Sequence, residues 1–500
     1  MKDIKYWENI IKERRKKTPF RKFVKEIASW SPLIMLYRRD NLISRFPDSP
    51  RIHHVVNKDD YETLRENFTN HGLDYGVDMP FQEQFQKLFQ SIDFSNTISF
   101  GKNENTEYAD IIIGSKDVYL SGVVVTSCEY ILYSSNIKEG SRWIINSSVV
   151  MDHSENIYMS SVVMKGYNIF YSRFINNCNN IWFSTNLIGC SECFGCNWLQ
   201  NQSYCINNKN YSKEDYFKYK NELLKKKSEY MTWYNTTLQI LWDNIASKNI
   251  TGHSIINSWN IENGYFIYNS EDGRNVILGG TLGTNQYIFD ACWYGSPYGN
   301  HFYGVASAGW WDNYYLSCHI SECSNIYYSY FLISCTFCLG CVGLKNKSFC
   351  ILNKQYTKEE WYILADKIFS QMNQNGTLGD FFPGNMNPFY FNDTMAYLID
   401  DSFSKEEVEK DGYMWRDDVI RIDIPEWSEI VRSNELDTYQ WYVRDGNWQI
   451  NPDIMTKVIV DKKRNYYKIV PMEYEFLMKH ALPLPEIHWL ERIKTGFRFQ

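Results

Sequence analysis

Apolar and polar positions alternate with a short, nearly fixed period between residues 141 and 190. Each repeat starts with a short strand centred on an Ile, places a Ser three positions after that Ile, and continues into a second apolar strand. Short strands at a fixed spacing, separated by Ser and Asn, are typical of a β-solenoid. The four clearest repeats are SRWIINSSVVMDH (141–153), SENIYMSSVVMKG (154–166), YNIFYSRFINNC (167–178) and NNIWFSTNLIGC (179–190).

Stacking explains how such a repeat can fold. One coil cannot bury its inward side chains alone, but neighbouring coils cover one another and pair their backbones at about 4.8 Å along the axis. Asn and Ser suit the corners because they tolerate tight turns and bond their own backbone. The pattern leaves open whether one repeat forms a full coil or half of one.

A cysteine-rich cassette occurs twice, which indicates an internal duplication. A C-x-x-C-x-x-C motif with a fourth Cys nine positions later spans 190–205 and again 335–350, at a constant offset of 145. Twelve of the 22 positions in 190–211 and 335–356 are identical, without a gap. Cys178 lies one repeat before Cys190, and Cys323 lies one repeat before Cys335, so we expect each pair of thiols to form a ladder.

The predicted fold class is mainly β with α: a duplicated parallel β-solenoid (β-helix) with helical inserts and small α+β terminal regions. A hydroxyl followed three positions later by an acid predicts a capped helix after each cassette, at Ser212 and Thr357. The expected parts are a basic arm and mixed region (1–107), a first solenoid (108–211), a helical insert (212–249), a second solenoid (250–356), a helix (357–372), and a connector with an α+β domain (373–500).

Further helices are predicted around the solenoids. Pro19 divides the N-terminal stretch into two short helices, and Ser404 caps another. The segment PFQEQFQKL (80–88) places its apolar residues on one helical face, so it should pack on the next domain along the chain. Pro471 opens a helix that should end before Pro483, after strands between 439 and 470.

Composition and charge indicate more about the cellular compartment of the protein than about its function. The net charge of −7 is small for 500 residues, so the field of the whole protein is weak. No apolar run approaches the 18–20 or so residues of a membrane span, and residues 1–27 lack the apolar core of a secretory signal. We therefore expect a cytoplasmic protein, or part of a particle assembled inside the cell, with thiols rather than disulfides.

The cassettes are the candidate metal site. Three thiols at this spacing, with a fourth nearby, satisfy the ligand count of an all-thiolate zinc site, although two separated C-x-x-C knuckles are the usual arrangement. Cys is also among the most frequently buried residues, so reduced core ladders are favoured over zinc. The candidate ligands are Cys190, Cys193, Cys196, Cys205, Cys335, Cys338, Cys341 and Cys350.

Basic residues interleave with apolar ones at the N-terminus. A basic arm of this kind can dock on nucleic acid or on another acidic partner, whereas the simpler interpretation is a solvated terminal helix. The candidate contact residues are Arg14, Arg15, Lys16, Lys17, Arg21 and Lys22.

The order of motifs resembles a family of uncharacterised, zinc-ribbon-bearing proteins common in bacteria of the candidate phyla radiation. The resemblance rests on DYGVDMPFQEQF (74–85), the two cassettes, GDFFP (379–383), PFYFNDT (388–394), EYEF (473–476) and LPLP (482–485). It implies an outline rather than an activity. The family's zinc ribbons lie before the first motif and after the last, but residues 1–127 and 351–500 here contain no Cys.

The leading hypothesis is a non-enzymatic structural or scaffolding role in a larger cellular or viral assembly, with other protein subunits as partners. One alternative is a glycan- or nucleic-acid-binding module that stacks ligands on paired aromatics such as Tyr327-Tyr328 or Trp310-Trp311. The other is a polysaccharide-active β-helix enzyme. Its candidate residues do not recur as pairs at ladder spacing: Asp110, Asp117, Asp290, Asp312, His153, His301 and His319.

Overall fold

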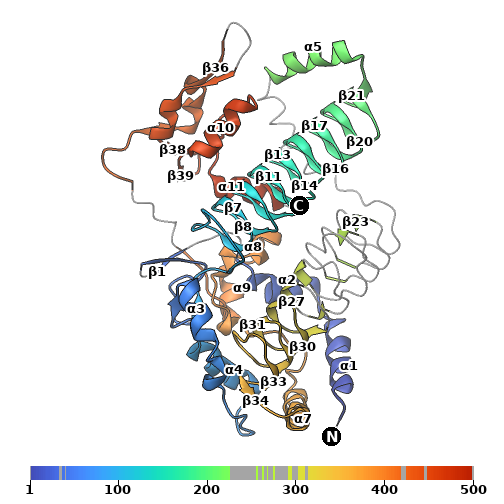
Figure 1. Ribbon diagram of the computed structural model, residues 1–500, viewed down its shortest axis with the longest axis vertical. Helices are drawn as coiled ribbons and strands as arrows, with labels where there is room; N and C mark the ends of the chain where they lie inside the picture. The colour runs from blue at the N-terminus through green and yellow to red at the C-terminus, as the bar shows by residue number, and fades with distance from the viewer. Residues whose placement is uncertain are drawn as a thin grey trace. The chain divides into compact units, whose positions relative to one another are not determined.

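The computed structural model describes residues 2–32, 37–39, 41–225, 313–417, 424–443 and 448–497, together with short stretches between 255 and 309. The chain divides into two compact units. Unit 1 combines Met1–Thr97 with Leu241–Arg416, and unit 2 combines Ile98–Ile240 with Asp417–Arg498 (Figure 1). Each unit therefore joins segments that are far apart in the sequence.

The first solenoid lies in unit 2 and consists of two nine-stranded sheets whose strands alternate along the chain. One sheet contains β5 (Ser99–Phe100), β6 (Asp110–Ile113), β8 (Gly122–Val125), β10 (Ser135–Lys138), β12 (Ser148–Met151), β14 (Ser161–Met164), β16 (Arg173–Asn176), β18 (Thr185–Ile188) and β20 (Asn197–Gln200). The other contains β7 (Lys116–Tyr119), β9 (Glu129–Leu132), β11 (Arg142–Ile145), β13 (Glu155–Tyr158), β15 (Tyr167–Phe170), β17 (Asn179–Trp182), β19 (Ser191–Phe194), β21 (Ser203–Ile206) and β22 (Lys209–Asn210).

The strand register confirms the predicted parallel solenoid and shows what one repeat builds. Ser148 pairs with Ser161, and Thr185 pairs with Asn197, so each pairing joins positions that are one repeat apart. One repeat is therefore a full coil that contributes one strand to each sheet. Only the last pair, β21 and β22, is antiparallel within this stack.

Every third residue of a coil points into the core. In one coil these are Ile169, Ser172, Ile175 and Cys178, and all four are at most 2 % exposed. Stacked coils therefore form four inward columns. Two columns are largely Ile, Val and Leu, and the other two carry small residues, mostly Ser, with Cys towards the end of the stack. The core is narrow, so a small side chain must alternate with each branched one.

The backbone turns through the left-handed region at the same period. Positive φ recurs at Asn180, Phe183, Asn186, Gly189 and Glu192, with values between 47° and 63°. This conformation is unfavourable for most L-residues, and Asn tolerates it better than others. The requirement explains the many Asn residues of the repeat, while the branched and aromatic residues at these positions depend on the stack to hold them.

The Ser column forms a buried hydrogen-bond ladder. The Ser160 hydroxyl donates to the Tyr158 carbonyl at 2.9 Å and accepts the N–H of Ser172, one coil later, at 3.0 Å. Ser147 and Ser172 repeat the arrangement one coil before and one coil after. Ser therefore bonds its own backbone, as predicted. The inward position and the bond to the next coil are what the structure adds.

A second ladder runs along the outside of the stack. The Asn156 side-chain amide donates to Asn168 at 3.0 Å, and Asn168 donates to Asn180 at 2.8 Å. Asn180 then donates to the Glu192 carboxylate at 2.7 Å. Lys220 of α5 (Lys213–Leu224) binds the same carboxylate at 3.0 Å. The ladder thus ends on a charge that ties the helix after the cassette to the coils.

The second solenoid lies in unit 1. Its sheets contain β25 (Ala291–Tyr294), β27 (Val305–Gly309), β29 (Cys318–Ser321) and β31 (Tyr330–Ile333), and β26 (Phe302–Tyr303), β28 (Tyr314–Tyr315), β30 (Ser324–Tyr327), β32 (Thr336–Leu339), β33 (Ser348–Ile351) and β34 (Lys354–Gln355). Around it lie α1 (Ile4–Arg15), α2 (Phe20–Ile27), η1 (Ala28–Trp30), β1 (Tyr37–Arg39), β2 (Leu42–Ser44), β3 (Val55–Val56), α3 (Lys58–Arg65), η2 (Phe68–His71), α4 (Phe81–Ser91), β4 (Phe94–Ser95), α7 (Lys358–Gln374), η3 (Gly384–Met386), η4 (Phe391–Asp393), α8 (Met395–Ile399) and α9 (Lys405–Lys410).

The N-terminal helices wrap around this second solenoid. α1 and α2 form on either side of Pro19, as predicted. α4 has the predicted apolar face, and this face packs on the second solenoid within unit 1. The ring centroid of Phe81 lies 5.8 Å from that of Tyr328, and the ring centroid of Phe89 lies 5.2 Å from that of Tyr330.

The C-terminal lobe of unit 2 packs on the first solenoid. Phe476 of α10 (Pro471–Lys479) lies over a column of outward aromatics, with ring centroids 6.3 Å from Trp143 and 6.0 Å from Tyr158. Trp489, which begins α11 (Trp489–Phe497), stacks on Tyr133 at 5.3 Å. The lobe also contains β35 (Ile430–Arg432), η5 (Ser433–Tyr439), β36 (Gln440–Tyr442), β37 (Trp448–Ile450), η6 (Pro452–Thr456), β38 (Val458–Val460) and β39 (Tyr466–Tyr467).

A buried ion pair joins the two helices of this lobe. The Arg492 guanidinium binds the Glu473 carboxylate, and the two side chains are 1 % and 0 % exposed. Two charges out of water are tolerated only as a pair, because removing one partner leaves the other uncompensated. The pair therefore fixes how α11 sits against α10.

Replacing Ser160 tests the inward ladder. Ser160→Ala leaves the buried N–H of Ser172 without its acceptor, which should cost about 2 kcal/mol. Protection of residues 160–184 in hydrogen exchange should fall about thirtyfold, a fold-change that corresponds to that free energy. Ser160→Cys should cost less, because Cys178 already accepts such a bond from Cys190 at 3.2 Å. Equal losses for both variants, or none, would contradict the ladder; the exposed Gln202→Ala is the control.

Acid should loosen the C-terminal lobe before pH 4. Burial lowers the pKa of His480 and His488 to about 4, below the value near 6.5 in an unfolded chain. The unfolded state therefore binds protons first as the pH falls. The contribution of the two neutral histidines to the free energy of unfolding is fully present above pH 6.5. It declines between pH 6.5 and pH 4, and it levels off below pH 4. Urea unfolding at several pH values measures this slope, and His480→Phe should flatten it. An unchanged slope in that variant would remove His480 from the explanation.

Candidate functional site

The thiols of both cassettes point into the core in the last coils of their solenoids. Cys193 pairs in register with Cys205, and Cys338 pairs with Cys350. The other cassette thiols continue the small-residue columns that Ser occupies in earlier coils. All eight predicted ligands are at most 2 % exposed: Cys190, Cys193, Cys196, Cys205, Cys335, Cys338, Cys341 and Cys350.

These thiols take over the hydrogen bonds of Ser. The Cys178 sulfur accepts the N–H of Cys190 at 3.2 Å, and the Cys323 sulfur accepts the N–H of Cys335 at 3.2 Å. Both predicted ladders are therefore confirmed. The Cys190 thiol in turn donates to the Leu199 carbonyl at 3.4 Å. A sulfur fills more of the interior than a hydroxyl oxygen while it serves the same backbone groups.

Burial and the contacts between neighbouring thiols shift the pKa values of these groups in opposite directions. Burial raises the pKa of Cys205 and Cys341, and it raises the pKa of Cys128 and Cys178, outside the cassettes, to about 12. The hydrogen bond with Cys193 lowers the pKa of Cys196, and the hydrogen bonds with Cys323 and Cys338 lower the pKa of Cys335 to about 4. Burial and the neighbouring Cys335 thiol raise the pKa of Cys323 far above its ordinary value. The thiolate is the nucleophile and the metal ligand, and a neutral thiol is inert in both roles. The cassette thiols do not share one direction of pKa shift, so it is their burial that places all eight in the core.

Metal binding finds no support in this geometry. Across the residues that the structure describes, no group of three or more His, Cys, Asp or Glu side chains is arranged to hold a metal ion. The twelve cysteines within that part of the chain are all free thiols. Zinc in the cassettes, which the ligand count allowed as the less favoured alternative, stays a prediction.

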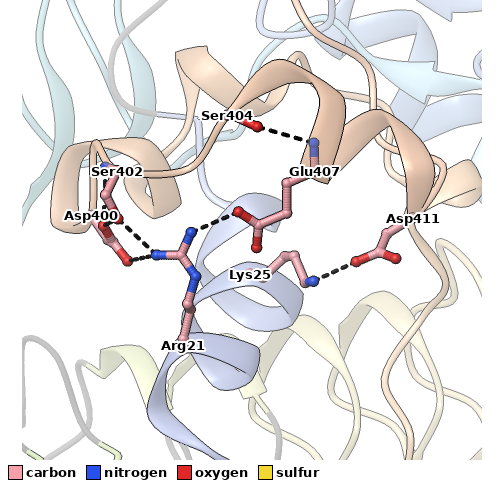
Figure 2. A network of polar contacts seen from close by, with 7 residues as sticks. All are labelled: Arg21, Lys25, Asp400, Ser402, Ser404, Glu407 and Asp411. Carbon is pink, nitrogen blue, oxygen red and sulfur yellow. Dashed lines mark hydrogen bonds and ion pairs between the residues drawn. The ribbon is translucent and has the colours of Figure 1, made fainter.

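The basic N-terminal residues contact acidic and carbonyl groups of unit 1. Figure 2 shows Arg21 of α2 between Asp400 and Glu407, with Nη2 2.7 Å from the Glu407 carboxylate. Lys25 pairs with Asp411 one helical turn along. The chain thus supplies its own acidic partner for this face of α2.

The remaining members of the basic group are placed differently. Arg14 donates to the Asn373 side chain at 2.9 Å, Arg15 pairs with Glu26 at 3.0 Å, and both act within unit 1. Lys22 binds Asp380 at 3.2 Å, and Lys16 binds Glu13 at 2.8 Å, while Lys17 is exposed. A nucleic-acid contact through these residues stays a prediction.

The candidate catalytic residues are dispersed. Asp110, Asp117 and His153 belong to unit 2 and His319 to unit 1. The Asp110 carboxylate is buried and accepts a backbone N–H at 2.9 Å, which makes it part of the first turns of the stack. His319 lies 3.0 Å from Arg45, and burial lowers its pKa well below the ordinary value. The others, Asp290, Asp312 and His301, lie outside the described residues.

The aromatic pair Tyr327-Tyr328 is not a stacking platform. The two side chains are 0 % and 2 % exposed. Tyr327 donates to Glu8 at 2.6 Å, and Tyr328 accepts the N–H of Gly379 at 2.7 Å. Both rings are committed to the interior of unit 1. The prediction of a ligand platform at this pair is therefore wrong, because helices from elsewhere in the chain cover the rings. Trp310 and Trp311 lie outside the described residues.

An Asn side chain closes the last coil of each solenoid. Asn208 accepts the N–H of Asn197 and donates to its carbonyl, both at 2.8 Å. Asn353 makes the same two bonds with Val342, at 2.8 and 2.9 Å. The side-chain amide thus makes the two hydrogen bonds that the backbone of a further coil would make. The two cassettes therefore end on one shared device.

In unit 1 the end of the stack is covered. Arg65 of α3 donates through Nε to the Gly343 carbonyl at 3.0 Å and through Nη2 to the Leu344 carbonyl at 3.2 Å. A Cβ on Gly343 would lie 2.7 Å from the Phe68 ring, so only glycine lets this ring approach. Asn353 is fully buried beneath the same segment. We call Lys58–Asp74 the cap segment.

In unit 2, no described segment lies over the corresponding end in the way that the cap segment does. Trp198 stands at the position of Gly343 and is 42 % exposed. Asn208, the counterpart of the buried Asn353, is exposed, as are Asn207 and Lys209. Among the described residues, no hydrogen bond to the Trp198 carbonyl corresponds to the one that Arg65 makes in unit 1. The end face Asn197–Asn210 is therefore the main difference between the described ends of the two cassettes.

Sequence reasoning missed this end face. The cassette alignment contains the signal, because Gly343 and Trp198 differ within a closely matched stretch. Arg65 could not be found in this way, since it belongs to a helix that is remote from Gly343 in the chain.

Comparison with known proteins gives no relative. No family model, no curated protein and no solved structure matches the chain. Within the described part of the chain, no helix is both long enough and apolar enough to cross a membrane.

Thiol labelling tests the assignment of the cassettes to the core. In native protein, iodoacetamide should modify the twelve described cysteines only as fast as the solenoids open, because all twelve side chains are buried away from the reagent. Peptide mapping by mass spectrometry gives the rate at each residue, and denatured protein is the control. Rapid native labelling at Cys193 or Cys338 would contradict the assignment. Elemental analysis of the same sample measures zinc directly.

Proposed function

We propose that the protein is a non-enzymatic scaffold, a structural component of a larger assembly whose other members are protein subunits. The observation that carries the proposal is the exposed end face Asn197–Asn210 at the last coil of the first solenoid. A free strand edge on a soluble protein is usually blunted by charge, by proline or by a cover. Residues 197–208 contain no charged residue and no proline. An edge of this kind suits contact with another polypeptide.

The distribution of reactive groups supports a structural role. The thiols of the cassettes bond the backbone of neighbouring coils, and among the described residues no three His, Cys, Asp or Glu side chains gather into a group that could hold a metal ion. A catalytic site needs such groups close together around a substrate. The described residues instead use their polar side chains to hold coils and helices in place.

The compartment we propose is the cytoplasm or a particle assembled inside the cell. Cys178 and Cys190 stack one coil apart as free thiols, as expected in a reducing environment.

The oligomeric state tests the proposal. Size-exclusion chromatography with light scattering, on full-length protein from its native source and on recombinant protein, should give a mass above 59.4 kDa for the native sample. A homogeneous monomer in both samples at about 100 μM would count against an assembly, because stable interfaces of standard size bind far below that concentration.

A nucleic-acid partner predicts a different outcome. Retention on immobilised DNA that falls steeply with salt, and that is lost in Lys16→Glu/Lys17→Glu, would favour the basic N-terminus as a contact. Retention that does not depend on salt would not favour the basic N-terminus as a nucleic-acid contact.

A further inference from the structure

The exposed end face has a built counterpart in the same chain, and this shows what kind of segment fits it. In inner coils, the carbonyl of the left-handed residue accepts an N–H from the following coil, as Asn313 does from Ile326 at 3.1 Å. Gly343 occupies this position in a last coil, where no coil follows. Arg65 takes the place of that missing N–H donor. A guanidinium can serve two carbonyls at once.

The first solenoid presents the same acceptor without the cap segment. Trp198 has the left-handed conformation of Gly343, with φ values of 56° and 70°. Asn208 already satisfies both backbone groups of Asn197. The Trp198 carbonyl then remains as an acceptor, and its counterpart, the Gly343 carbonyl, accepts a hydrogen bond from Arg65. A segment that binds this face should therefore supply a hydrogen-bond donor rather than an acceptor.

Charge gives a second requirement. Lys354, beside the second cassette, pairs with Asp74 at the end of the cap segment. Lys209 is its counterpart in the first cassette and is exposed. It is the only charged residue in 197–210. A segment that fits both cassettes therefore carries an arginine near its middle, as the cap segment does at Arg65, and a carboxylate at its end.

The same face of a second copy is a poor occupant. A two-fold contact would set the Trp198 carbonyl against its own equivalent and would set Lys209 near Lys209. Strands with a left-handed residue at every third position are also unsuited to an ordinary antiparallel ladder, because the regular extended backbone is interrupted. The cap of unit 1 is built from a helix and a turn, not from a strand.

We propose that Asn197–Asn210 is the docking site for a helix–turn segment of a partner polypeptide, which supplies an arginine to the Trp198 carbonyl and a carboxylate to Lys209. This inference rests on the proposed scaffold function and names its contact surface. Trp198 occupies the place that Phe68 fills beside Gly343, so the partner segment has a small residue there.

A size-exchange experiment tests the proposal with a defined probe. One probe is a fluorescent synthetic peptide with the native sequence of residues 57–76, and a second probe is the same peptide with Tyr61→Ala/Phe68→Ala. Each peptide is titrated into the full-length protein and into its Trp198→Gly variant. The peptide with Tyr61→Ala/Phe68→Ala should bind the wild-type protein, because it leaves room for the Trp198 ring. The native peptide should bind the Trp198→Gly variant about tenfold more tightly in Kd than it binds the wild-type protein, because its own rings then fill the space that Trp198 leaves. Arg65→Ala in either peptide should weaken binding about tenfold or more.

The controls locate the peptide. Lys209→Glu should weaken binding, whereas Lys354→Glu should not, and cross-linking should reach Lys209. Binding that ignores Trp198→Gly and Lys209→Glu, cross-linking at Lys354, or no binding at about 1 mM would overturn the proposal. So would a peptide-free dimer whose hydrogen exchange is slowed at 197–210, since a second copy would then be the occupant. An assembly that forms without peptide binding would sink this inference and leave the scaffold function standing.

Discussion

The structure depends on hydrogen bonds between coils that no coil can make alone. Each coil bends through left-handed residues at every third position, and most of these are not glycine. Such a residue costs about 1 kcal/mol or more in isolation. The stack recovers this cost because each turn places a Ser or Cys side chain where it accepts an N–H from the following coil. A coil is therefore stable only between neighbours.

The ends of a stack follow from the same constraint, since the last coil has a neighbour on one side only. Both solenoids meet part of the demand with an Asn that imitates a further coil. The hairpin after each cassette and the capped helix after it extend the cover on one side. The remaining carbonyl needs a donor from elsewhere, and in unit 1 the donor comes from Arg65. Distant segments of the chain therefore join each unit at the places where repetition stops.

The periodic parts of the fold could be predicted from sequence, and the covering parts could not. The coils, the Cys ladders and the caps at Ser212 and Thr357 each follow from patterns within a single turn of helix or one coil. The surface on which α4 packs and the ion pairs that Arg21 forms depend on residues far away in the chain. A basic amphipathic stretch has the same sequence pattern whether it binds acidic residues of its own chain or those of another molecule. For the same reason, the pattern of Tyr327 and Tyr328 could not distinguish an exposed pair from a buried one.

The two similar cassettes allow a comparison within one chain. They share the thiols and the closing Asn, which serve the coil itself, and a following Lys, which in the second cassette pairs with Asp74 of the cap segment. They differ where the next layer begins: Gly343 admits the Phe68 ring, and Trp198 brings a ring of its own. A glycine with positive φ beneath an aromatic ring can be replaced only when that ring is absent. A cap of this size is therefore incompatible with Trp198, while the Trp198 carbonyl has, among the described residues, no donor that corresponds to Arg65.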